Sequence, residues 1–217
     1  EARRLAGPRH GGVAAAVGPR DTERALALDR AGVAAIVFDS AHVHKPELIV
    51  AIRGVRHKVK AKLIVGNIVT AAAARVLLAV ADGIKVGVGP GSICTTRVVA
   101  GVGMPQLTAI MEVAKAVKAK RIPIIADGGM RYSGDVVKAL AAGASAVMLG
   151  GMLAGTDESL GEVVTVDGAK VKAYRGMGSL GAMTGGKSSD RYFQFGTKKY
   201  VPEGVEAAIA YQGSLAD

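Results

Sequence analysis

A regular alternation of short aliphatic runs with longer amphipathic segments constrains this chain more than any other feature. Six runs rich in Val, Ile, Leu and Ala recur, at residues 13–18, 34–39, 62–67, 83–88, 122–127 and 145–150. The stretches between them carry apolar residues at helical spacing, at residues 22–31, 46–59, 71–81, 105–119 and 134–142. Such runs are typical of buried strands followed by helices. We therefore predict an α/β protein built from successive βα units around a parallel sheet.

Polar residues or glycines stand at the end of almost every run. Asp39 and Asn67 close two of them, and residues 87–94, 127–129 and 150–151 follow three others. A closed barrel carries its chemistry on loops after many strands, whereas an open doubly wound sheet concentrates it at one switch point. The pattern favours a (β/α)8 TIM barrel.

The predicted barrel is incomplete, because a complete one usually takes about 250 residues and only six units precede a change of pattern at Gly161. Residues 1–160 would hold the βα units, with the first two strands missing at the N-terminus, where the chain opens abruptly at residues 1–4. Residues 161–217 would form a hairpin, a mobile flap and a tail of the same domain, over the carboxyl-terminal mouth of the barrel. Two unpaired edges would make such a chain poorly stable or prone to aggregate.

Composition narrows the class of protein further. Hydrophobic residues make up 50% of the chain and aromatic residues only 4%, so the core must be aliphatic. The net charge of +10 comes from scattered basic residues, which favours solvated helix faces or an anionic small-molecule substrate over nucleic acid. With one cysteine, no signal-peptide pattern and no long apolar run, we expect a cytoplasmic protein without disulfides or a membrane partner.

Cys94 is the single cysteine, and it lies in a glycine-rich loop at residues 86–97. A lone cysteine is most often a small buried hydrophobe. A thiol on a flexible loop beside hydroxyls and an arginine is instead typical of a nucleophile. The residues around Cys94 therefore decide whether it is a packing residue or a nucleophile.

Three strand ends are compatible with an anion. Residues 89–92 (GPGS) can present backbone N–H groups and one hydroxyl, although they could equally form a simple turn. Asp127 with Gly128 and Gly129 could receive sugar hydroxyls and a phosphate, or Asp127 could be a helix N-cap. Gly150 and Gly151 form the third. Together they indicate a phosphorylated substrate.

Two further segments carry candidate chemistry. Residues 39–44 (DSAHVH) hold an aspartate and two histidines, but no matching cluster completes a zinc site, so a ribose-binding Asp39 is the simpler interpretation. Residues 190–192 (DRY) could be a solvated charge pair, or a catalytic element on a lid hinged at residues 176–186.

Four of these motifs closely resemble the inosine 5'-monophosphate (IMP) dehydrogenase family. They are residues 89–103 (GPGSICTTRVVAGVG), 126–135 (ADGGMRYSGD), 174–183 (YRGMGSLGAM) and 189–193 (SDRYF). The resemblance spans nearly the whole chain. It implies that Cys94 adds to C2 of IMP, that NAD+ takes the hydride, and that hydrolysis of the thioimidate releases xanthosine 5'-monophosphate (XMP), in guanine nucleotide biosynthesis.

The same resemblance implies a role for each remaining site residue. The catalytic group would be Cys94, Thr96, Arg191 and Tyr192, with Arg191 as the base. Substrate contacts would be Ser92, Asp127, Gly129, Gly150, Gly151, Tyr174, Met177, Gly178 and Glu203. Cofactor contacts would be Asp39, Ser40, Asn67 and Gly87. Backbone carbonyls of Gly89, Gly91 and Cys94 would hold a potassium ion, and the protein would act as a homotetramer.

The chain also departs from the family pattern. Val43 stands where the family usually has glycine, and Gly151 stands where many members have serine. The printed residues include neither the regulatory CBS pair nor the segment that would follow Asp217. Two alternatives stay open. One is GMP reductase, which shares the barrel and the cysteine but has no hydrolytic step for a flap to serve. The other is a truncated nucleotide-binding protein without activity.

Overall fold

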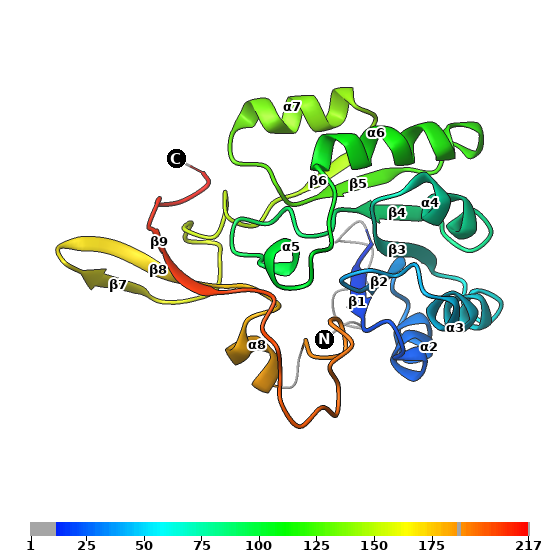
Figure 1. Ribbon diagram of the computed structural model, residues 1–217, viewed down its shortest axis with the longest axis horizontal. Helices are drawn as coiled ribbons and strands as arrows, with labels where there is room; N and C mark the ends of the chain where they lie inside the picture. The colour runs from blue at the N-terminus through cyan, green and yellow to red at the C-terminus, as the bar shows by residue number, and fades with distance from the viewer. Residues whose placement is uncertain (1–11, 186–187, 217) are drawn as a thin grey trace.

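The computed structural model describes residues 12–185 and 188–216, and its centre is a curled parallel sheet (Figure 1). Its strands are β1 (Ala14–Val17), β2 (Ala35–Asp39), β3 (Lys62–Ile68), β4 (Gly83–Val86), β5 (Ile124–Asp127) and β6 (Ala146–Met148). They are hydrogen-bonded in chain order, from β1 to β6. All six predicted strands are present, and the curled sheet confirms part of a (β/α)8 barrel.

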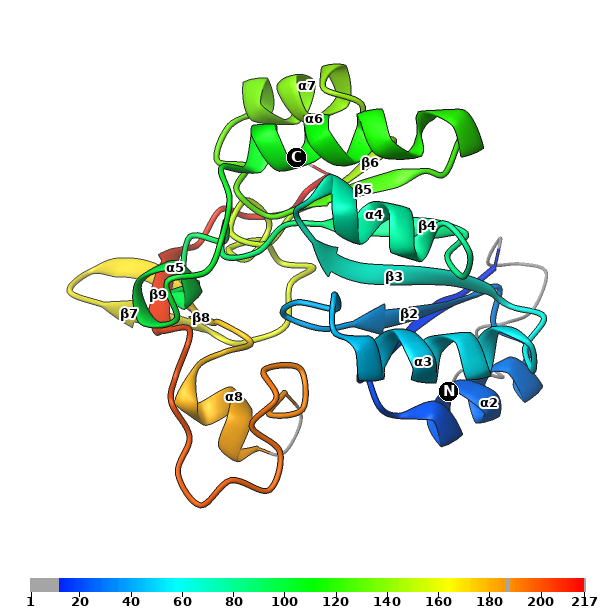
Figure 2. The same cartoon turned by 45° about the vertical axis from the view of Figure 1, so that its right-hand side comes forward.

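Five helices cover one face of this sheet: α2 (Thr22–Arg30), α3 (Pro46–Arg56), α4 (Ala71–Leu77), α6 (Gln106–Val117) and α7 (Ser133–Ala141). Figures 1 and 2 show α2 and α3 beside the first strands and α6 and α7 beside the last. Side-chain caps fix two helix starts, because Thr70 accepts from the Ala73 N–H and Asp21 accepts from the Arg24 N–H.

The predicted helix boundaries were too long in two places. The segment predicted at 46–59 ends at Arg56, and the one at 71–81 ends at Leu77. Val59, Val80 and Ala81 are buried all the same. They continue the apolar pattern because the loops that carry them also pack on the core.

The core lies between the sheet and these helices and is aliphatic, as the composition predicts. Fully buried side chains include Ile36, Leu48, Leu63, Ile84 and Ile110. Phe38 is the one aromatic among the buried hydrophobic residues of the described ranges. Burial of such side chains supplies most of the free energy that orders the strands.

A second, antiparallel sheet lies at the carboxyl ends of the parallel strands (Figure 1). It consists of β7 (Val163–Val166), β8 (Ala169–Arg175) and β9 (Glu206–Ala210), hydrogen-bonded in that order. The predicted hairpin is confirmed: Asp167 and Gly168 form its turn with φ of 49° and 79°, as a tight two-residue turn requires. Three elements were not predicted: α5 (Thr96–Val99), α8 (Leu180–Thr184) and β9.

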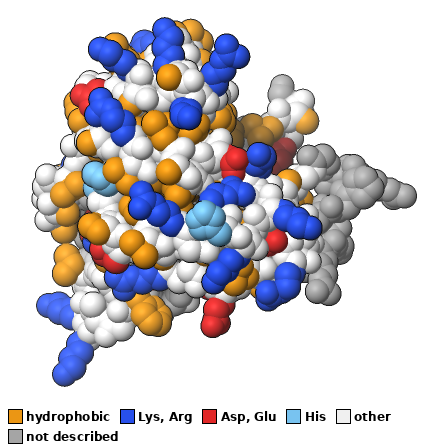
Figure 3. Space-filling model, turned by 90° about the vertical axis from the view of Figure 1, so that its right-hand side faces the viewer, with side chains coloured by type: hydrophobic (Ala, Val, Ile, Leu, Met, Phe, Trp, Pro, Cys, Tyr) orange, Lys and Arg blue, Asp and Glu red, His pale blue; other side chains and the backbone are white. Residues whose placement is uncertain are grey.

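The surface agrees with scattered positive charge. Figure 3 shows Lys and Arg side chains spread over the face it presents, among apolar and uncharged surface. Within the described residues, no helix has both the length and the apolar character needed to cross a bilayer. The abrupt start at residues 1–4 lies outside the described ranges.

Candidate active site

A cavity of about 350 Å³ opens at the carboxyl ends of the parallel strands. Strand ends and glycine-rich loops form one wall, and the end of β8 with the segments after it forms the other. Predicted site residues that line it are Asn67, Gly87, Gly89, Gly91, Ser92, Cys94, Thr96, Asp127, Gly129, Gly150, Gly151, Tyr174, Met177, Gly178, Arg191, Tyr192 and Glu203. The structure thus brings together residues that are up to 136 positions apart, from Asn67 to Glu203.

Cys94 lies in the cavity wall and is partly exposed, so it does not belong to the hydrophobic core. Its Sγ is 3.3 Å from Oγ1 of Thr96 and 3.7 Å from the carbonyl oxygen of Glu203. Backbone hydrogen bonds hold the loop on both sides, from the Thr95 N–H to Glu203 (2.9 Å) and from the Val205 N–H to Ile93 (3.0 Å). The thiol is therefore presented to the cavity on a fixed loop.

The predicted phosphate contacts lie next to one another. A Cβ added to Gly151 would lie 3.2 Å from Oγ of Ser92, and one added to Gly150 would lie 2.9 Å from the Tyr174 hydroxyl. Gly128 and Gly129 have φ of 82° and 85°, which favours glycine and keeps side chains out of the space. The arrangement leaves room for an anion between hydroxyls and backbone.

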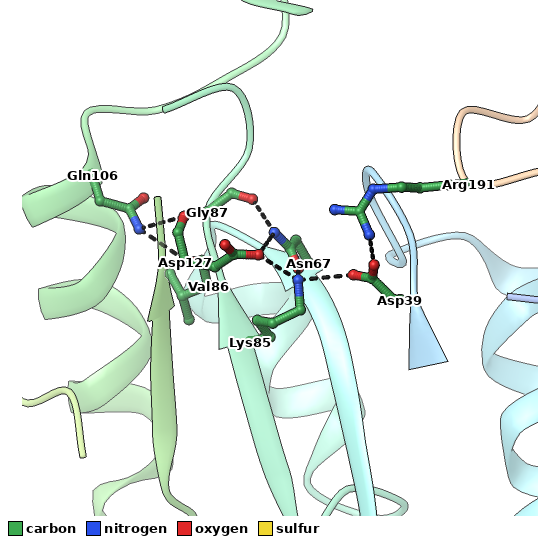
Figure 4. Close-up of polar contacts among 8 residues, drawn as sticks. All are labelled: Asp39, Asn67, Lys85, Val86, Gly87, Gln106, Asp127 and Arg191. Atoms are coloured by element: carbon green, nitrogen blue, oxygen red, sulfur yellow. Dashed lines mark hydrogen bonds and ion pairs between the residues drawn. The ribbon is translucent and has the colours of Figure 1, made fainter. Parts of the chain in front are cut away.

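A buried lysine joins three strand ends beside the cavity (Figure 4). The Lys85 side chain on β4 is 2% exposed, and its Nζ lies 2.8 Å from Oδ1 of Asp39 on β2. The same ammonium donates to Oδ2 of Asp127 on β5 and to Oδ1 of Asn67 on β3. Asn67 in turn donates from Nδ2 to Asp127 (3.0 Å) and to the Gly87 carbonyl (2.6 Å).

The Arg191 segment is docked on the end of β2. The Arg191 guanidinium pairs with Oδ2 of Asp39, and the Arg191 carbonyl accepts a hydrogen bond of 3.0 Å from the Ala41 N–H. Phe193 packs against the core, with Nζ of Lys45 3.3 Å above its ring. The flap is therefore held by backbone, charge and apolar contacts together.

The two flap side chains next to each other shift each other's ionisation. Burial lowers the pKa of Arg191, against the opposing effect of Tyr192. Burial also raises the pKa of Tyr192, where Arg191 acts in the other direction and Cys94 reinforces the rise. A lowered arginine pKa is what a proton-accepting role at this position requires.

Some predicted residues do not line the cavity. Asp39 lies just behind it, paired with Lys85 and Arg191. Ser40 is fully buried, so this conformation gives its side chain no access to a cofactor. Val43 is also buried, and its N–H donates to the Asn67 carbonyl (2.9 Å).

The histidines of residues 39–44 form no metal cluster. The His42 and His44 rings meet edge to face at 6.3 Å. Burial, followed by the charges of His44 and Lys45, lowers the pKa of His42. Among the described residues, no group of three His, Cys, Asp or Glu side chains could hold a metal ion.

The residues predicted to hold potassium fit a hard cation through backbone oxygen. The Gly91 carbonyl accepts the Cys94 N–H at 3.1 Å, whereas no described hydrogen bond uses the carbonyls of Gly89 and Cys94. Carbonyl oxygens of this kind suit such an ion.

Two positioning residues were missed in the sequence. Lys85 was passed over although a lysine inside an otherwise apolar run is itself a signal. Gln106 begins α6, and its Nε2 donates to the carbonyls of Val86 (2.9 Å) and Asp127 (3.2 Å), which ties β4 to β5. No sequence motif marks that role.

Comparison with known proteins adds an independent line of support. A family model described as "IMP dehydrogenase / GMP reductase domain" matches residues 7–217. The chain is 57% identical to inosine-5'-monophosphate dehydrogenase of Methanocaldococcus jannaschii and 55% identical to that of Aquifex aeolicus. These matches cover 94% and 95% of this chain, but only 44% and 42% of the relatives' length.

A solved structure shows the same fold. It is GMP reductase from Trypanosoma brucei in complex with guanosine 5'-monophosphate, with a TM-score of 0.83 and 44% identity. The match covers 93% of this chain and 42% of that one.

Proposed function

Since the chain belongs to the IMP dehydrogenase / GMP reductase family, we propose that it oxidises IMP to XMP with NAD+ through a covalent intermediate on Cys94. The observation that carries this proposal is the meeting of Cys94 and Thr96 with Arg191 and Tyr192 around one cavity. A nucleophile alone would serve any member of the family. A partly buried arginine and tyrosine on a docked flap suit a hydrolytic step as well.

In the first stage, IMP lies with its phosphate among Ser92, Gly150, Gly151 and Tyr174, and with its ribose diol on Asp127. The Cys94 thiolate adds to C2 of the purine, and a carbon–sulfur bond forms. NAD+, when bound, would accept the hydride, which carries the two electrons that C2 loses as that carbon is oxidised. The substrate is then a thioimidate on Cys94.

In the second stage, water attacks C2 and the carbon–sulfur bond breaks, which releases XMP and the thiolate. Arg191 takes a proton from that water, with Tyr192 and Thr96 beside it. The docked flap also excludes bulk water from the thioimidate. The carbonyls of Gly89, Gly91 and Cys94 would hold potassium and keep the Cys94 loop in register.

The cofactor would bind where the flap now lies, so the flap must release before hydride transfer. Asp39 could accept a ribose hydroxyl once Arg191 leaves it, with Ser40, Asn67 and Gly87 nearby. A homotetramer in the cytoplasm remains part of the proposal, as does the absence of a nucleic-acid or membrane partner.

The test is NADH absorbance after IMP, NAD+ and potassium are mixed with the protein. We expect NADH from the wild-type protein and from Lys198→Ala, an exposed change seven residues after Arg191, and none from Cys94→Ala. IMP binding without NADH would contradict the proposal and favour a binding protein.

GMP reductase is the second candidate, because the solved structure is one. Loss of NADPH that depends on GMP, with no NADH from IMP, would decide for it. The Arg191–Tyr192 pair argues against it, since a reductase has no water to activate.

A further inference from the structure

Lys85 is a cation that the chemistry proposed above does not use, although it touches both halves of the site. Its side chain is 2% exposed. Strand register places it opposite Gly66 of β3. A Cβ on Gly66 would lie 2.5 Å from the Lys85 Cβ, so the neighbouring strand leaves space for the lysine stem.

The Lys85 ammonium donates to Asn67 on β3 and to Asp127 on β5. It also forms an ion pair with Asp39 on β2, so β4 supplies one charge to side chains of three other strands. The two carboxylates meet on a single Nζ, which puts their bound oxygens within roughly 5 Å of each other, a range in which like charges raise a pKa.

The charges of this cluster balance only while both cations are present. Asp39 and Asp127 contribute two negative charges, and Lys85 and the docked Arg191 contribute two positive ones. When Arg191 leaves, Lys85 is the one cation among the described residues that still pairs with either carboxylate. Breaking such a buried pair on one side leaves the other charge uncompensated.

We propose that Lys85 is a positioning residue that keeps Asp39 and Asp127 ionised and correctly oriented, and thereby links the substrate side of the site to the flap and cofactor side. Within the described hydrogen bonds, Oδ2 of Asp127 is occupied by Lys85 and Asn67, and Oδ1 is not used. Oδ1 is therefore free for the ribose diol. The inference rests on the proposed function only for the identity of that diol.

Burial lowers the pKa of Lys85, and Asp127 opposes that shift. Besides Asp127 and Arg191, the titratable side chains that line the same cavity are Cys94, Arg131, Tyr174, Arg175, Tyr192 and Glu203. None of them is hydrogen-bonded to Lys85 in the described structure.

The first test needs no ligand. Carboxyl NMR titration of Asp39 and Asp127, assigned with Asp39→Asn and Asp127→Asn, reports their ionisation directly. In Lys85→Met we expect one of the two pKa values to rise by about one unit or more, because like charges then face each other. In the double variant Lys85→Met/Asp39→Asn, the pKa of Asp127 should fall again, because the facing negative charge is gone. In Lys85→Arg, both aspartates should titrate almost as in the wild type.

The second test is IMP affinity by calorimetry. We expect Lys85→Met to bind IMP about 10- to 100-fold more weakly, as loss of a charged hydrogen-bond partner implies. The ratio of its Kd to the wild-type Kd should fall as pH rises from about 5 to about 7, because a carboxyl whose pKa is raised by about one unit regains its charge over that range. Titration of the substrate phosphate affects both Kd values equally, so it does not change their ratio. Adding Asp39→Asn should recover affinity.

Lys172→Met is the matched control, because Lys172 is also 2% exposed but, among the described residues, donates only to the carbonyls of Thr156 and Ser159. It should change thermal stability and not IMP affinity. Unchanged aspartate titration in Lys85→Met, or equal IMP binding by Lys85→Met and wild type, would overturn the proposal. If wild type binds no IMP, the proposed function fails instead, and the NMR titration still decides the role of Lys85.

Discussion

At the scale of single residues, Arg191 combines two properties that seldom occur together. It forms an ion pair with Asp39, and it is also buried enough that its pKa is lowered. The ion pair holds the flap down, and the lowered pKa brings the neutral guanidine closer to a working pH. Docking and proton transfer would therefore depend on one side chain.

Arg191→Ala should separate the two chemical stages. Without the base, NADH should appear once per site and then slowly, while hydrolysis falls by about 10²- to 10⁴-fold. Intact-mass measurement should show the nucleotide adduct accumulating on Cys94. Because the wild-type base must lose a proton first, wild-type turnover should rise with pH and the residual turnover of the variant should not.

Lys198→Ala, which removes an exposed cation seven residues after Arg191, is the control and should behave as wild type. A variant that turns over more slowly without accumulating adduct would place Arg191 before the covalent step, contrary to this expectation.

At the scale of elements, the two ends of the parallel strands have different tasks. The carboxyl ends carry the cavity, whereas the amino ends carry a structural ion-pair cluster. Asp82, just before β4, lies 2.6 Å from Arg56 at the end of α3 and 3.1 Å from Lys62 of β3. It also accepts the Leu63 N–H at 2.9 Å.

Asp82→Asn should therefore lower thermal stability and leave IMP affinity unchanged. The loss should be about 1 kcal/mol, below the usual range for hydrogen bonds to charged groups, because solvent screens this partly exposed cluster. Desolvation raises the pKa of Asp82, but the Leu63 N–H and the two cations outweigh it and the pKa is lowered. Its contribution is then complete above the unfolded pKa of about 4 and is lost as pH falls through the folded value.

Melting curves against pH should accordingly show the difference between wild type and Asp82→Asn shrinking in acid. Glu112→Gln, an exposed carboxylate on α6, should show no difference at any pH. A change in IMP affinity with Asp82→Asn would mean that the two strand ends are coupled.

The elements also show how far a sequence can predict this site. Asp39, Asn67 and Asp127 could be placed together because hydrophobic runs locate strand ends and parallel strands bring those ends to one edge. α5, α8 and β9 could not, because they are short and depend on contacts such as Thr95 with Glu203 and Val205 with Ile93. Lys85 was missed because periodicity gives its place on a strand and not the acceptors that surround it.

At the scale of the whole molecule, the described sheet is open. β1 pairs only with β2, and β6 pairs only with β5, whereas a complete barrel closes eight strands on one another. The chain spans less than half the length of the relatives it matches. Among the described residues, the outer sides of β1 and β6 have no strand partner, and Met148 on β6 is 42% exposed.

An open edge of this kind predicts self-association of the chain on its own. Sedimentation velocity over a range of concentrations should show assembly that grows with concentration. Ala14→Lys puts a charge on an exposed position of edge strand β1 and should reduce assembly about tenfold, since burying that charge at a strand interface is costly. Val50→Lys adds the same charge to an exposed site on α3 and should leave assembly unchanged. Equal effects of both variants would assign the assembly to net charge, and a chain that stays monomeric throughout would show that its edges are already protected.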